Sequence, residues 1–160
     1  MTTSSTKRFS LRQTLKDWAA KWRRRTRAER LLLIEAFFLL GLARLAVLLL
    51  PFRWLAASLG EHMKETGQTL SPDALKTARL IGGAVRSAAG YTPWGSVCLP
   101  QAAAAKWMLG RRHIASTLYL GVAKDDAPGK LAAHAWVRSG PAILTGAQGR
   151  SRYTVVSTFS

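Results

Sequence analysis

The sequence predicts an α+β fold, in which helices form the first two thirds of the chain and an antiparallel sheet forms the rest. Apolar residues recur every three or four positions as far as Gly110, and shorter strand-like segments separated by turn residues follow from Ser116. Helices followed by strands are typical of α+β proteins. A chain of 160 residues is long enough to form one domain with its own core, together with a helical extension.

The first thirty residues are strongly basic. They contain ten Lys or Arg residues against Asp17 and Glu29, a net +8 that is half of the total charge of +16. Such a segment suits nucleic acid, an anionic membrane surface or an acidic polypeptide, or it is a solvated tail. Trp18 and Trp22 lie four residues apart, so we expect an amphipathic helix and no nucleic-acid site. The segment does not resemble a secretory signal, and a cytoplasmic location is expected.

Residues 31–50 form the most apolar stretch of the chain. Twenty residues are just enough to span a bilayer. However, the stretch includes Glu35 and Arg44, which would lie on nearly opposite sides of a helix, and each would be costly at the middle of a membrane. We therefore favour a buried or surface-lying helix and leave open whether it enters a membrane. Pro51 is expected to end this helix, and a shorter one is predicted from Phe52.

The elements after residue 60 are indicated by their boundary signals. Residues 60–70 are polar and predict a linker. Ser71 provides an N-cap and Pro72 a first helical residue, so a helix is predicted to about residue 89. A further helix is predicted over 96–110. Four strands are then predicted, at 116–122, 132–138, 142–145 and 153–159.

We accordingly divide the chain into a basic N-terminal helix or tail (1–30), a helical region (31–90) and a core that carries the chemistry (91–160). The last region holds the lone cysteine, Cys98. One thiol cannot form an intramolecular disulfide, and with three scattered histidines it does not make a standard structural zinc site, so neither a metal nor a cofactor is expected.

Cys98 is then either a buried apolar residue or a nucleophile. Its position at the start of a predicted helix favours the nucleophile, because the N–H groups of a helix start stabilise a thiolate and an oxyanion. Such a thiol also needs an imidazole close by, and His134 on a predicted strand can provide it.

Two segments carry a resemblance to known proteins. Ser96-Val97-Cys98-Leu99-Pro100-Gln101-Ala102 and Ala133-His134-Ala135-Trp136-Val137 occur in the order found in papain-like and transglutaminase-like folds. Together with residues 107–112 and 116–122, they resemble the leader peptidases of lasso-peptide biosynthesis, which are transglutaminase-like B proteins. The resemblance covers about residues 28–160 and implies a papain-like or transglutaminase-like helix packed on an antiparallel sheet.

The resemblance also implies an activity. It implies a cysteine peptidase that removes the leader from a ribosomally synthesised lasso precursor, before an ATP-dependent cyclase closes the macrolactam ring. Cys98 would be the nucleophile, and His134 the general base and then the acid to the leaving amine. The backbone N–H of Cys98 would donate to the oxyanion. Residues 1–90 lack the alternating strands of a winged-helix domain, so we expect a stand-alone peptidase that works with a separate leader-recognition protein.

The third catalytic residue is the point at which this chain departs from the family. The usual residue is an Asp roughly a dozen positions after the His, and no Asp or Glu follows His134. The orienting role is left to the Thr145 hydroxyl or a backbone carbonyl, with Asp125 or Asp126 as further alternatives.

An alternative function also stays open. The chain would then be a non-catalytic, membrane-associated scaffold of a peptide-maturation complex, in which the N-terminal helices are the working part. On either interpretation, the basic and apolar helices are expected to dock onto the recognition protein, the cyclase, or a membrane surface next to an exporter.

Overall fold

The computed structural model describes residues 22–93, 97–124 and 130–160. The part of the predicted basic helix before residue 22, with Trp18, lies outside the described residues, as do Asp125 and Asp126. The described elements are α2 (Arg27–Leu49), α3 (Phe52–Ser58), α4 (Pro72–Ala89), α5 (Cys98–Gly110), β1 (Thr117–Lys124), β2 (Leu131–Ser139), β3 (Ala142–Thr145), the 3-10 helix η1 (Arg150–Arg152) and β4 (Thr154–Phe159).

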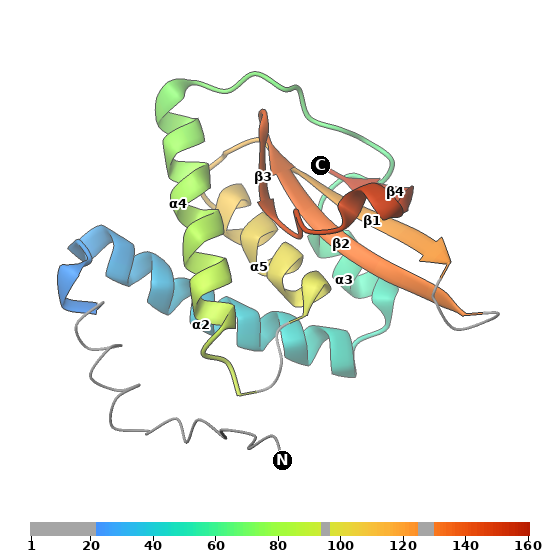
Figure 1. The fold of residues 1–160 in the computed structure, drawn as a ribbon, viewed down its shortest axis with the longest axis horizontal. Coiled ribbons are helices and arrows are strands. Elements are labelled where there is room, and N and C mark those ends of the chain that lie inside the picture. The colour runs from blue at the N-terminus through green and yellow to red at the C-terminus, as the bar shows by residue number, and fades with distance from the viewer. Residues whose placement is uncertain (1–21, 94–96, 125–129) are drawn as a thin grey trace, which may run out of the picture.

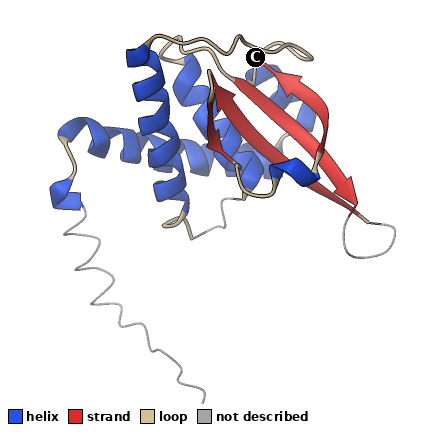
Figure 2. Ribbon diagram, turned by 45° about the horizontal axis from the view of Figure 1, so that its top comes forward, coloured by secondary structure: helices blue, strands red, loops and turns tan. Residues whose placement is uncertain are grey.

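The predicted α+β fold is confirmed. The strands form one antiparallel sheet in the order β3-β2-β1-β4, and Figures 1 and 2 show the helices gathered on one side of it. β1 pairs with the whole of β2, from Thr117 opposite Arg138 to Lys124 opposite Leu131. β3 pairs only with Val137–Ser139 at the end of β2. The edge of β2 that precedes Val137 therefore has no pairing with β3.

The helices begin and end at the signals expected of them. The Ser71 hydroxyl accepts a hydrogen bond from the Ala74 N–H at the start of α4. α2 begins four residues before the apolar stretch, because Thr26 and Glu29 form a capping box there. α5 begins at Cys98, whereas the sequence predicts a start at residue 96, and residues 94–96 are outside the described part of the chain.

α5 is the central helix of the fold. Its alanine run, residues 102–105, is fully buried, because these small side chains let neighbouring elements approach closely. α2 and α4 pack on α5, and the inner face of the sheet packs on its other side. One apolar cluster results, and its largest members are Leu40, Leu59, Ile81, Met108, Leu109, Leu118 and Leu144.

Candidate active site

Cys98 is the first residue of α5 and is half-buried against the apolar core. The preceding residue, Val97, makes no side-chain hydrogen bond to the helix start. Pro100 has no N–H, and the N–H of Gln101 already bonds to the Val97 carbonyl at 3.3 Å. The N–H groups that remain for a ligand in this first turn are therefore those of Cys98 and Leu99.

His134 lies on β2, opposite Gly121 of β1. Its Nε2 atom is 2.9 Å from the carbonyl oxygen of Gly146. A backbone carbonyl can only accept a hydrogen bond, so Nε2 must carry the hydrogen and donate it. The neutral ring then has its lone pair on Nδ1, which is the tautomer that a general base on that side requires.

Gly146 can reach His134 because it has no side chain. Its φ is +66°, and a Cβ atom there would lie 2.3 Å from the Ala135 carbonyl oxygen. The strand before it is held by α4, since the Arg86 guanidinium donates a hydrogen bond to the Leu144 carbonyl. Gly146 is not among the site residues that the sequence predicts. The only sequence signal for it is a glycine directly after a predicted strand, twelve residues beyond His134.

Thr145, the predicted orienting residue, lies next to this carbonyl. This residue is 1% exposed, and its Oγ1 atom has no hydrogen-bond partner among the described residues. The sequence leaves a hydroxyl, a backbone carbonyl and an acid open as the orienting group, and within the described residues a backbone carbonyl bonds to the ring of His134. The two candidate acids, Asp125 and Asp126, lie outside those residues.

The His134 imidazole stacks on two aromatic rings. Tyr153 stacks on it with ring centres 4.9 Å apart, and Trp136 with ring centres 5.9 Å apart. Gly121 makes room for both, because a Cβ atom there would lie 2.9 Å from each of these side chains. Trp136, which the sequence favours as a core residue, is buried. It lies on the same face of the sheet as His134, away from the helices, and it also stacks on Tyr119.

A polar network continues along the same sheet face. Tyr119 donates to the Glu65 carboxylate at 2.8 Å and accepts from Arg138 Nε at 2.8 Å. Burial raises the pKa of Tyr119, although the hydrogen bond from Arg138 acts in the opposite direction. Arg138 also donates to the Thr66 carbonyl. The predicted linker, residues 60–70, is therefore tied to the sheet close to Trp136.

Cys98 packs against the apolar core, which lies on the helix side of the sheet. By strand alternation Ala135 and Val137 face the helices, and His134 faces the opposite side. No hydrogen bond joins the thiol and the imidazole within the described part of the chain. In both views the first turn of α5 lies beside the segment joining β3 to η1, which contains Gly146 (Figures 1 and 2).

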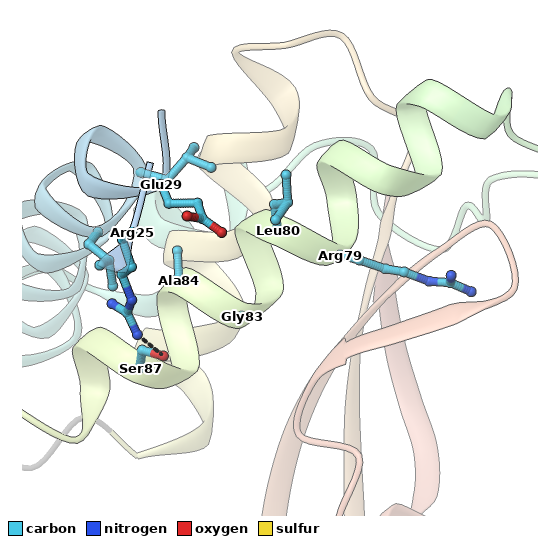
Figure 3. A pocket seen from close by; sticks show the side chains of 9 residues that line it. Arg25, Glu29, Arg79, Leu80, Gly83, Ala84 and Ser87 are labelled. Atoms are coloured by element: carbon cyan, nitrogen blue, oxygen red, sulfur yellow. Dashed lines mark hydrogen bonds between the residues drawn. The ribbon is translucent and has the colours of Figure 1, made fainter. Parts of the chain in front are cut away.

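A pocket lies elsewhere, between the start of α2 and α4 (Figure 3). Across this pocket, the Arg25 guanidinium donates a hydrogen bond to the Ser87 hydroxyl at 3.5 Å. Its lining contains neither Cys98 nor His134. The residues that the structure describes also include no group of three His, Cys, Asp or Glu side chains that could hold a metal ion.

The sequence matches the family described as the transglutaminase-like superfamily over residues 46–158, a range that includes Cys98, His134 and Gly146. No curated protein and no solved structure matches the chain.

Proposed function

The chain belongs to the transglutaminase-like superfamily, and we propose that it is a cysteine peptidase with Cys98 as its nucleophile and His134 as its general base. Cysteine peptidases and transglutaminases of this superfamily share acyl transfer to a thiol. The observation that carries the proposal is the hydrogen bond from His134 Nε2 to the Gly146 carbonyl, because it leaves Nδ1 as the basic nitrogen.

The reaction proceeds in two acyl transfers. His134 Nδ1 takes the proton of the Cys98 thiol, and the sulfur attacks the scissile carbonyl carbon. The C–N bond then breaks, the imidazolium gives its proton to the leaving amine, and a thioester to Cys98 remains. In the second half His134 takes a proton from water, the hydroxide attacks the thioester, and the thiol is released with its proton. The net change is one peptide bond and one water converted into an acid and an amine.

The surroundings of the two residues support these roles. The oxyanion of each tetrahedral intermediate is expected to accept from the Cys98 N–H at the start of α5. The Gly146 carbonyl accepts the Nε2 hydrogen and so holds the His134 tautomer. In enzymes with a full catalytic triad, a carboxylate has this role. Because a carbonyl carries no net charge, it stabilises the imidazolium less than a carboxylate would.

We propose the leader of a lasso-peptide precursor as the substrate, cleaved before macrolactam formation. The support is the resemblance of the segments around Cys98 and His134 to lasso-peptide leader peptidases. Within residues 22–90 the structure describes helices and one isolated bridge from His62, and none of the strands of a winged-helix domain. A separate leader-recognition protein and an ATP-dependent cyclase are accordingly the proposed partners.

The test is leader cleavage followed by mass spectrometry, with a lasso precursor, the recognition protein and the full chain. Wild type is expected to cut, and Cys98→Ala and His134→Ala are each expected to abolish cutting. His62→Ala is the matched control, because this exposed histidine bonds to Ser157 on the far strand of the sheet. Cleavage that survives Cys98→Ala would mean that the thiol is structural.

A second measurement does not depend on the choice of precursor. Alkylation of Cys98 by iodoacetamide at neutral pH, followed by peptide mass spectrometry, reports whether the thiol is reactive. We expect rapid labelling of wild type and slower labelling of His134→Ala. Slow labelling of wild type, with no cleavage by any form, would favour the non-catalytic scaffold instead.

A further inference from the structure

α2 is apolar on two opposite faces. Its inner face, Leu33, Ala36, Leu40 and Ala43, is buried in the core. A second row of large apolar residues runs along the outer face at spacings of three and four, the spacing of one helical face. We call this row the outward stripe, and it consists of Leu31, Ile34, Phe38, Leu42, Leu45 and Leu49, which are 43–74% exposed.

α3 carries two further exposed aromatic side chains, which are two residues apart and so point to different sides of that helix. Phe52 and Trp54 on α3 are 50% and 63% exposed. Figure 1 shows α2 along one side of the molecule, with α4 and α5 on its other side. The outward stripe runs from Leu31 to Leu49, which is about 27 Å along the helix axis at 1.5 Å per residue. A continuous apolar ridge of this length exceeds the scattered apolar residues that a protein surface normally carries.

The charges around the outward stripe are almost all positive. Residues 22–58 contain seven Arg residues and no Lys, against two Glu. Glu29 is engaged in the capping box with Thr26. Glu35 is held on the molecule by Arg112 and Arg111, at 2.6 and 3.3 Å. Arg23, Arg24 and Arg53 form no ion pair with another residue that the structure describes.

α2 is the one helix of the described residues that is long and apolar enough to cross a membrane, and 28% of its most apolar window is buried. Crossing a bilayer would expose the Glu35 ion pairs and strip the inner face from the core. A helix that keeps its inner face in the protein can instead lie in the plane of the bilayer, with only its outer face inserted.

We propose that the outward stripe and α3 dock the protein onto the surface of an anionic phospholipid bilayer. Lipid chains adapt to a convex ridge of Leu and Phe side chains, whereas a protein partner would need a groove that matches it. Trp54 suits the interface between lipid chains and headgroups. Arg23, Arg24 and Arg53, which flank the ridge, complement anionic headgroups.

The test is co-sedimentation of the full chain with vesicles of phosphatidylcholine, alone or with about 30% phosphatidylglycerol. Wild type is expected to bind the anionic vesicles at least about tenfold more tightly than the neutral ones. Phe38→Gln with Leu42→Gln is expected to weaken that binding by at least about tenfold, because two inserted side chains are lost. Arg23→Gln with Arg24→Gln should weaken binding to anionic vesicles alone.

The matched control is Leu131→Gln with Val156→Thr, which removes two exposed apolar residues from the sheet and should leave vesicle binding within about twofold of wild type. Unchanged thermal melting would show that the stripe variant is folded. The proposal is overturned if wild type does not sediment with anionic vesicles, or if the stripe variant binds as wild type does. It is also overturned if wild type is a dimer that only the stripe variant dissociates, since a second copy would then cover the ridge.

Discussion

The imidazole of His134 donates its Nε2 hydrogen to the carbonyl oxygen of Gly146, twelve residues further along the chain, at 2.9 Å. The chain contains no acid after His134. A backbone carbonyl can take the orienting role only if the main chain passes close to the ring, and a glycine allows that approach because a Cβ atom would collide with Ala135. The geometry of the proposed dyad thus depends on the path of the backbone after β3.

Gly146→Ala is expected to impair both folding stability and cleavage. The matched control is Gly149→Ala, because Gly149 also has a positive φ but has open space where its Cβ atom would be. The control should cost about 1–2 kcal/mol of left-handed strain. Gly146→Ala should cost about 1–3 kcal/mol more through the collision and lower kcat about tenfold to a hundredfold through the displaced carbonyl. Urea unfolding and cleavage rates would check this, and equal effects of the two variants would contradict it.

Thr145→Val is expected to leave cleavage intact and to raise the free energy of unfolding by up to about 1 kcal/mol. The Thr145 hydroxyl is buried without a partner in the described residues, so an isosteric methyl group removes a desolvation cost. Thr117→Val is the control, because the buried Thr117 hydroxyl accepts from the Thr66 N–H at 2.9 Å, and its loss should cost about 1–3 kcal/mol. A loss of cleavage in Thr145→Val alone would assign the orienting role to that hydroxyl.

Much of the fold follows from local signals in the sequence. Ser71 and Pro72 define the start of α4, Pro51 separates α2 from α3, and the period change after Gly110 marks the sheet. These signals are reliable because capping bonds and proline geometry involve residues that are neighbours along the chain.

The details of the site depend on contacts that are distant in sequence. The carbonyl of Gly146 that orients His134 is a backbone group. Every residue has such a group, so the residue type at this position does not indicate the role. Likewise, Glu35 reads as an isolated charge in an apolar stretch, and its partner Arg112 lies 77 residues away. Neither pairing could be predicted without the path of the chain between them.

Glu35→Gln is expected to destabilise the protein by about 1–3 kcal/mol, measured by urea unfolding. The Glu35 carboxylate accepts two hydrogen bonds from Arg112, at 3.1 and 2.6 Å, and its side chain is only 18% exposed. The exposed pair of Glu61 with Lys64 is the control, and Glu61→Gln should change stability by less than about 0.5 kcal/mol. Equal losses in the two variants would mean that the ion pair of Glu35 with Arg112 contributes no more than a surface pair.

The stability of the protein is expected to depend on pH through Lys106 on α5. Its ammonium donates to the Ser116 carbonyl at 2.6 Å, and burial lowers the pKa of this lysine from 10.5 to about 8. Between these two values the unfolded chain binds more protons at Lys106 than the folded chain does. The contribution of Lys106 to the free energy of unfolding therefore rises as pH increases through that window, and its cost is fully present below it.

Lys106→Met removes this titration. The melting temperature of wild type should therefore rise relative to that of the variant as pH increases from about 8 to about 10. Because both proteins share every other titrating group, their difference isolates Lys106. Lys76→Met, which removes an exposed lysine from α4, is the matched control and should follow wild type across the same range. Thermal melts of the three proteins provide the measurement. A constant difference between wild type and Lys106→Met would mean that water or structural relaxation keeps the ammonium solvated in the folded state.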